Sequence, residues 1–308
     1  MTISSHHPEA ISLKASLDEL ANRIACGLQE DGTMEMQPGI FFYRASASGE
    51  PIHAVLEPSC CVIAQGAKET LIADEIFRYD PAHYMITTMQ LPLVGKVVKA
   101  SPDQPYLGVR IVLDPQLVTT MMVEAGGGLL RGDRAVKAMN VSVLDADLLD
   151  AILRLVRLTE SPADYGVLAP LVMREITYRL LKGDQGSRLQ HLATLGGQSH
   201  RMAQAVKLLQ EHFNQPIRID AISQKLGMSV SGFHAHFKAT TAMSPLQFQK
   251  QIRLQEARRL MLSEHLDAAE AGSRVGYEDA SHFSREYKRH FGAPPMRDVE
   301  RLRHLVAK

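Results

Sequence analysis

The spacing of apolar positions changes twice along the 308-residue chain and predicts three successive regions, of which the first and last are helical and the middle one is β-rich. Leucine and isoleucine recur every three or four positions over residues 12–29, which is typical of an amphipathic helix. Between residues 40 and 113, short β-type runs alternate with turn residues roughly every ten positions, which favours a small antiparallel barrel or sandwich. Helical spacing returns after residue 114. The sequence therefore predicts an α+β fold.

Three further helices are predicted directly after the β-rich part. Asp114 and Pro115 suit the cap and the first turn of one helix. Apolar stripes predict two more helices over residues 145–158 and 168–181. The apolar faces of these two helices pack either against the β-rich part or against a second copy of the chain.

Two stretches have the composition of connecting segments. Gly126–Gly128 predicts a flexible loop, and no strand–turn–helix motif that would bind phosphate surrounds it. Residues 184–199 are rich in glycine, serine and glutamine, which is typical of a linker. We therefore expect an N-terminal domain over residues 1–183 and a C-terminal domain over residues 200–308.

Charge is divided along the chain in the same way, although the total formal charge is zero. Residues 1–197 hold 17 Lys and Arg against 23 Asp and Glu, a net charge of −6. Residues 198–308 hold 17 against 11, a net charge of +6. A basic domain joined to an acidic one indicates that the C-terminal domain binds a polyanion.

The stretch around Gly227 has the pattern of two short helices joined by a tight turn. Apolar residues recur at helical spacing over residues 219–226, and Phe233 and Phe237 lie four positions apart after the turn. Glycine accepts the left-handed conformation that a sharp turn needs, and Ser229 can cap the second helix. The pattern fits a helix-turn-helix, whose second helix enters the DNA major groove, and it also fits a small helical bundle.

The same pattern occurs a second time about fifty residues further along the chain, which favours the DNA-binding interpretation. Gly227 recurs as Gly276 at an offset of 49 residues, and Phe233 recurs as Phe283 at an offset of 50, so the second turn is one residue longer. A helix predicted from Pro245 separates the two copies and spans about 28 Å at 1.5 Å per residue. One turn of DNA rises about 34 Å, so two reading helices could enter successive major grooves.

Three segments of the C-terminal domain carry a resemblance to a known family. They are GMSVSGFHAHFK (227–238), SPLQFQKQIRLQEARRLM (244–261) and VGYEDASHFSREYKRHFGAPP (275–295). In these segments the C-terminal domain resembles the DNA-binding domain of AraC/XylS-type transcription regulators. The resemblance implies an all-α domain in which a long helix bridges two helix-turn-helix units, with double-stranded DNA as the partner.

The β-rich part also looks like the N-terminal domain of one AraC-type subgroup. The segments that carry this resemblance are EPSCCVIAQGAKET (57–70), YDPAHYMITT (79–88) and SPDQPYLGVRIVLDP (101–115). The resemblance implies a cupin-like antiparallel β-barrel with flanking helices, which senses a small-molecule effector.

The resemblance also implies which residues contact DNA. Six are expected to read bases: Ser231, His234 and Ala235 in the first reading helix, and Ala280, Ser281 and Arg285 in the second. Four are expected at phosphates: Lys238, His282, Lys288 and Arg289. The alternative for each basic residue is a solvated surface charge.

Arg285 is the candidate with the sharpest chemistry, because arginine can bind guanine O6 and N7 through two hydrogen bonds, worth about 1–3 kcal/mol of discrimination. Its alternative role is a surface salt bridge with Glu278, Asp279 or Glu286. Ala235 stands where many relatives carry arginine. We therefore expect the second reading helix to carry more of the sequence specificity than the first.

The effector site is less well marked. Four polar side chains of the β-rich part are candidates, each with a structural role as the alternative: Tyr43, Arg44, Tyr84 and Arg110. A metal-dependent cupin enzyme would need a closely spaced His-x-His pair, which residues 38–113 do not contain. We expect no metal, no cofactor and no catalytic residues. The alternative function is a cupin-type enzyme, or a protein-interaction module, with an incidental basic tail.

Cysteine use and hydropathy indicate a cytoplasmic protein. The three cysteines, of which Cys60 and Cys61 are adjacent, form neither a disulfide framework nor a zinc spacing. This pair consists either of buried strand residues or of a redox sensor. The start MTISSHHPEA has no export signal, and no run reaches the ~18–20 apolar residues that cross a bilayer. A homodimer and RNA polymerase are further expected partners.

Overall fold

The computed structural model describes residues 6–125, 137–193 and 198–306. The predicted Gly126–Gly128 loop lies outside these residues. The chain divides into two compact units, and the division along the sequence falls between His200 and Arg201. The first unit contains most of the β-rich part and its helices, and the second contains residues 53–55 and the helical part of the chain after residue 200.

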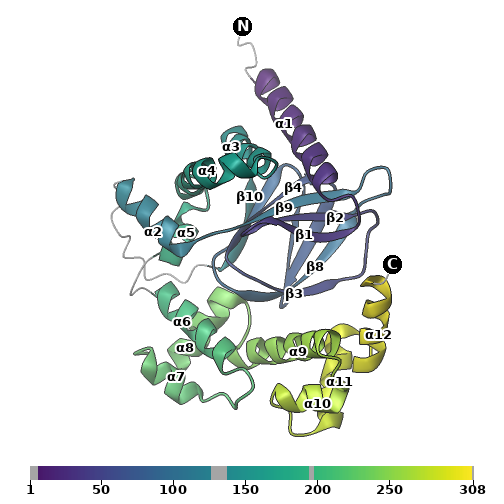
Figure 1. The fold of residues 1–308 in the computed structure, drawn as a ribbon. Helices are drawn as coiled ribbons and strands as arrows, with labels where there is room; N and C mark the ends of the chain where they lie inside the picture. Colours follow the sequence, from purple (N-terminus) through teal and green to yellow (C-terminus); the bar gives the residue numbers. More distant parts are fainter. Residues whose placement is uncertain (1–5, 126–136, 194–197, 307–308) are drawn as a thin grey trace. The chain divides into compact units, whose positions relative to one another are not determined.

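Two separate sheets make up the β-rich part (Figure 1). The larger sheet has the order β1-β2-β9-β4-β7-β10, and its neighbouring strands run antiparallel. Its strands are β1 (Gly32–Gln37), β2 (Ile40–Ala45), β9 (Tyr106–Val112), β4 (Ser59–Gln65), β7 (His83–Thr87) and β10 (Met139–Val143). The smaller sheet has the order β3-β8-β5-β6, with strands β3 (Ile52–Leu56), β8 (Leu91–Lys99), β5 (Ala67–Ile72) and β6 (Glu75–Tyr79).

The expected closed, cupin-like barrel is therefore wrong, and the sandwich alternative is confirmed. A barrel closes only when every strand edge finds a partner, and the described strands instead form two sheets that do not pair with each other. One reason is β10, which lies far along the chain and occupies the edge of β7. The α+β class itself is confirmed.

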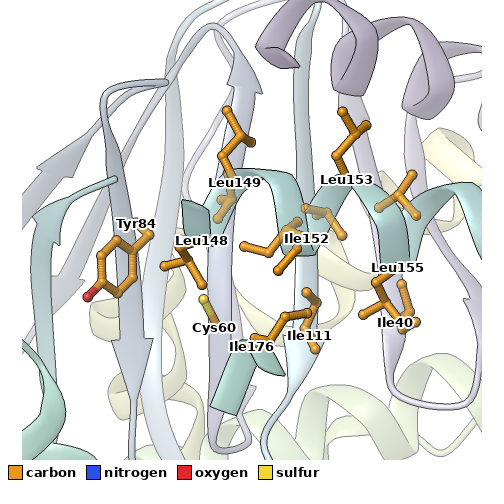
Figure 2. Packing of buried hydrophobic residues seen from close by; sticks show 14 of the residues in the cluster. Ile40, Cys60, Tyr84, Ile111, Leu148, Leu149, Ile152, Leu153, Leu155 and Ile176 are labelled. Atoms are coloured by element: carbon orange, nitrogen blue, oxygen red, sulfur yellow. The ribbon is translucent and has the colours of Figure 1, made fainter. Parts of the chain in front are cut away.

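One face of the larger sheet is covered by helices, and the main core of the unit lies between them (Figure 1). The helices of this unit are α1 (His6–Gly27), α2 (Pro115–Glu124), α3 (Ala146–Leu158), α4 (Pro162–Lys182) and α5 (Gly186–Ala193). Figure 2 shows α3 side chains facing strand residues across this core, among them Leu148, Ile152, Ile40, Cys60 and Ile111. Because successive side chains of a strand point to opposite faces, every second residue of these strands lies on the face of the larger sheet that the helices do not cover.

Part of the segment predicted to be a linker is helical. Helix α5 contacts α2 and α4, and its Leu189 is fully buried in the core of the first unit. Helix α2 begins after Asp114, whose carboxylate accepts a hydrogen bond from Gln116 N at 2.8 Å, as the cap prediction requires.

Seven helices make up the described residues of the C-terminal part. They are α6 (Gln198–Glu211), α7 (Ile219–Lys225), α8 (Val230–Thr241), α9 (Pro245–Ser263), α10 (Ala268–Arg274), α11 (Ala280–Phe291) and α12 (Pro295–Val306). The two predicted helix-turn-helix pairs are α7–α8 and α10–α11, and α9 is the long helix between them. Ser244 begins α9 with a capping box, since its side chain accepts from Gln247 N and the Gln247 side chain accepts from Ser244 N.

Candidate nucleic-acid interface and effector site

The first reading helix, α8, is held by a cap and by two aromatic rings. Ser229 Oγ accepts a hydrogen bond from Gly232 N at 3.1 Å, which satisfies one free donor of the first turn. Phe233 and Phe237 are fully buried, with ring centroids 5.5 Å apart. Their spacing fixes the opposite face of the helix, which presents four exposed candidates to solvent: Ser231, His234, Ala235 and Lys238.

The second reading helix, α11, is built in the same way. Asp279 caps it through a hydrogen bond accepted from His282 N, and Phe283 and Tyr287 are fully buried beneath it. Both reading helices have twelve residues, and the turn before α11 is one residue longer than that before α8, as predicted. The exposed residues of α11 include the remaining candidates: Ala280, Ser281, His282, Arg285, Lys288 and Arg289.

Arg285 does not form the salt bridge that was its alternative role. Within the described residues, its exposed side chain has no hydrogen-bond or ion-pair partner. The neighbouring Glu286 instead binds Lys250 at 3.0 Å and accepts a hydrogen bond from Tyr277 Oη at 2.9 Å. Burial would raise the pKa of Glu286, but these hydrogen bonds lower it overall, so Glu286 stays charged. The guanidinium of Arg285 thus remains available to a base.

The four phosphate candidates fall into two pairs. Lys238 and Lys288 are exposed, and neither forms an ion pair within the described part of the chain. Arg289 and His282 both face Glu286, at 2.8 and 3.8 Å. Phosphate contact by Arg289 or His282 would compete with Glu286, so the two lysines are the more readily available cations.

A buried carboxylate holds the second helix-turn-helix unit together. Asp298, on α12, is fully buried and accepts a hydrogen bond from Tyr287 Oη at 2.8 Å. Arg258, on α9, pairs with the same carboxylate at 2.8 Å, as does Arg301. Burial and the nearby Asp298 raise the pKa of Tyr287, so its hydroxyl remains a donor. The network ties α9, α11 and α12 to one another.

The four effector candidates do not lie together. Tyr43 and Arg110 occupy the face of the larger sheet opposite the helices, where Arg110 Nε donates to Tyr43 Oη at 2.9 Å. Arg110 also stacks on the Phe41 ring, 3.9 Å from its centroid. Arg44 and Tyr84 belong to the other face: Arg44 lies 3.7 Å from Asp31, and Tyr84 is buried in the core beneath the helices (Figure 2). Only Tyr43 and Arg110 could contact the same ligand.

Lys68 joins these two residues and was missed in the sequence. It lies on β5 of the smaller sheet, and its amino group is 5.5 Å from the centre of the Tyr43 ring. Burial lowers the pKa of Lys68, and the charge of Arg110 lowers it further. Strand alternation could have found it, because Lys68 shares a face with the buried Thr70 and Ile72. We call Tyr43, Lys68 and Arg110 the between-sheet cluster.

Known protein families match both the β-rich part and the helical C-terminal part of the chain. A family described as the AraC-type transcriptional regulator N-terminus matches residues 37–188, and a helix-turn-helix domain family matches residues 222–301. The chain belongs to the AraC family of transcription regulators. Because this is a family of DNA-binding regulators and not of enzymes, the cupin-type enzyme alternative is wrong.

Relatives of this AraC-family chain are activators and regulators of the helix-turn-helix type. The transcriptional activator RhaS of Salmonella agona is 29% identical over 165 residues, which cover 53% of this chain and 58% of RhaS. The transcriptional regulator ArgR of Pseudomonas aeruginosa is 28% identical over 142 residues, which cover 46% of this chain and 43% of ArgR. The matching part spans roughly half of each relative's length.

Solved structures of ToxT from Vibrio cholerae share the fold. ToxT bound to an unsaturated fatty acid has a TM-score of 0.54 and 10% identity, covering 88% of this chain and 97% of ToxT. ToxT bound to (E)-4-(8-methylnaphthalen-1-yl)but-3-enoic acid has a TM-score of 0.56 and 10% identity, covering 84% and 96%. At this identity the likeness shows the fold alone.

Cys60 and Cys61 have the properties of structural residues in this AraC-family chain. Both lie on β4 and are buried, and burial raises the pKa of Cys61 to about 11 and that of Cys60 still further. A thiol that stays protonated at neutral pH is a poor nucleophile, so the redox-sensor alternative has no chemical support. No group of His, Cys, Asp or Glu among the described residues could hold a metal ion. None of the described helices is long and apolar enough to span a membrane.

Proposed function

We propose that this chain is a sequence-specific transcription regulator that reads two successive major grooves and responds to a small-molecule effector. The observation that carries the first part is the duplicated helix-turn-helix, with six exposed candidates for base contact on α8 and α11. Arg285, Lys238 and Lys288 have exposed side chains without an ion-pair partner among the described residues, and they supply base-reading and phosphate-binding chemistry. RNA polymerase and a cytoplasmic location are part of the same proposal.

Selection of sites from random double-stranded DNA by the purified chain tests this function. We expect two half-sites about one helical turn apart. With about four phosphate contacts the affinity should fall roughly a hundredfold between 50 and 200 mM salt. Recovery of unrelated sequences only, with and without cell extract as a source of effector, would refute sequence-specific binding.

The effector is proposed to be a small organic acid that binds the between-sheet cluster. Two cationic side chains face the space between the sheets, and within the described residues no carboxylate pairs with Lys68 or Arg110. Removing a cation from water without a counter-charge is costly, and a bound carboxylate would offset that cost. The rings of Phe41 and Tyr43 beside them suit an apolar body on the acid. The ligands named for ToxT are also acids, but its low identity carries no further weight.

Lys68→Met should raise the melting temperature of the unliganded chain by a few degrees. The substitution keeps the length of the side chain and removes its half-buried charge, and about 1 kcal/mol shifts the melting temperature of a domain of this size by roughly 2–4 °C. In thermal-shift measurements, benzoate and octanoate should stabilise the wild type but not the variant.

The matched control is Lys96→Met on the neighbouring strand β8, where the lysine is exposed. It should change neither the melting temperature nor the response to acids. The proposal of an acidic effector fails if Lys68→Met destabilises the chain and leaves that response intact. It also fails if benzamide and octanamide stabilise the wild type as much as the acids do.

A homodimer is proposed through α4, as the apolar faces of the predicted helices suggested. Four apolar side chains are exposed along this helix: Val167, Leu168, Leu171 and Tyr178. Exposed apolar residues that cluster on one helix are typical of an interface, and a two-fold dimer buries the same patch on both copies. Light scattering tests the proposal, since a monomeric mass at micromolar concentration contradicts it.

A further inference from the structure

The two helix-turn-helix units are joined by more than the long helix α9. The first half of α9 packs against the first helix-turn-helix unit, where the rings of Phe248 and Phe237 have centroids 5.4 Å apart. The second half serves the second unit, where Leu254, Ala257 and Leu260 belong to its core. A second connection between the two helix-turn-helix units would limit their rotation relative to each other in addition to the shared helix.

Arg253, in the middle of α9, makes that second connection. Its guanidinium donates to three backbone carbonyls: Nε to Phe213 O at 2.6 Å, Nη2 to Gln215 O at 2.9 Å and Nη1 to Gly276 O at 2.9 Å. Phe213 and Gln215 precede α7 in the first unit, whereas Gly276 lies in the turn of the second. One side chain thus binds both units at once.

Gly276 is held tightly against the first helix-turn-helix unit, at the segment that precedes α7. Its φ is +89°, and a Cβ at this position would lie 2.1 Å from the carbonyl oxygen of Asn214. The equivalent Gly227 of the first turn also has a positive φ, +63°, but nothing lies within 4 Å of where its Cβ would be. The glycine of the second turn is therefore required by the close approach as well as by the turn, whereas Gly227 is required by the turn alone.

Two further contacts support this connection. Gln249 Nε2 donates to the same Gln215 oxygen at 2.7 Å, and its side chain is buried. Phe213 packs against the core of the second unit. Hydrogen bonds from a charged donor are stronger than neutral ones, and only a guanidinium presents a planar fork that can reach three carbonyls.

We propose that Arg253 and Gly276 act as a clamp that sets the distance and rotation between the two reading helices, and thereby the spacing of half-sites that the chain accepts. The inference rests on the proposed function for its effect on DNA. Arg253 is a positioning residue, since it acts through α8 and α11 and lies on neither.

A distance measurement without DNA tests the clamp itself. Spin labels are placed at Gln224→Cys on α7 and Ser273→Cys on α10, both exposed, in a full-length chain whose exposed Cys26 is serine. Electron paramagnetic resonance should give a narrow distribution of distances for this chain and a broader one after Arg253→Ala. The matched control is Arg259→Ala on the same helix, where Arg259 is exposed and binds Glu256 at 2.7 Å within α9. The distribution of distances should stay narrow in this control.

Gly276→Ala should broaden the distribution as Arg253→Ala does, and Gly227→Ala is its control for the strain of a left-handed alanine. Circular dichroism would reveal whether Arg253→Ala unfolds the second helix-turn-helix unit. In that case Gly276→Ala, which adds only a methyl group, decides whether the clamp exists. Unchanged narrow distributions in both Arg253→Ala and Gly276→Ala would overturn the clamp.

A selected DNA site then tests the consequence for spacing. One extra base pair between the half-sites moves the second by about 3.4 Å and rotates it by about 34°. The wild type should lose about tenfold or more in affinity, as it would from losing the contacts to a single base pair, whereas Arg253→Ala should bind both spacings almost equally. An equal loss at every spacing would refute the positioning role. Absence of any selected site would refute the proposed function and leave the distance test to decide the clamp.

Discussion

Asp298→Ala is expected to destabilise the second helix-turn-helix unit by about 3–5 kcal/mol, because it removes one partner from a buried ion pair. Arg258 would remain in a nearly buried position, 13% exposed, without its carboxylate. Tyr287, fully buried, would lose the acceptor of its hydroxyl. A buried donor left without an acceptor costs about 1–3 kcal/mol by itself.

The loss should be local, so the measurement must resolve regions of the chain. Amide hydrogen exchange should show faster exchange in α10, α11 and α12, with α8 and the sheets unchanged, because units of a fold open separately. Glu300→Ala, an exposed carboxylate on the same helix, is the matched control and should change stability by less than about 0.5 kcal/mol.

A compensating substitution tests the cause. Arg258→Met in the Asp298→Ala background should recover part of the lost stability, because an apolar side chain needs no counter-charge in that position. If the double variant is as unstable as the sum of the two single variants, the destabilisation arises from packing and not from the unpaired arginine.

Local spacing was sufficient to predict the helices of the C-terminal part from sequence. Both helix-turn-helix pairs depend on contacts between residues close in sequence, such as Phe233 with Phe237, and these leave a periodic pattern. The apolar spacing after Pro245 gave the bridging helix, and the repetition of the pattern at Gly276 and Phe283 gave the longer second turn. Exposure of Arg285 follows from the same periodicity.

Contacts between distant strands could not be predicted in this way. The strand alternation predicted sheet structure but does not indicate which strand edges pair, so the prediction of a barrel was wrong. β1 is mostly exposed and β10 is short and far along the chain, and neither was anticipated. Lys68 and Arg110 come from different sheets and meet only in the folded chain. Arg253 was missed for another reason: its partners are backbone carbonyls, which have no signature in the sequence.

Arg285→Ala is expected to remove the preference for one guanine in the second half-site and to weaken binding to the selected site by about 5–150-fold, which corresponds to about 1–3 kcal/mol. The reason is geometric. Arg285 is exposed on the reading helix and, within the described residues, is not held by a carboxylate, so it enters the groove without breaking an ion pair. Binding to sites that already carry a different base at that position should hardly change.

Lys288→Ala, one turn further along α11, is the matched comparison, because its lysine is also exposed and unpaired within the described part of the chain. A phosphate contact carries no sequence information, so this variant should weaken binding to all sequences alike and reduce the salt slope by about one. Arg285→Ala should instead change the preference among the four bases at one position of the site and at no other. If instead it weakens every sequence equally, Arg285 binds a phosphate, and the base specificity of this helix lies in Ala280 and Ser281.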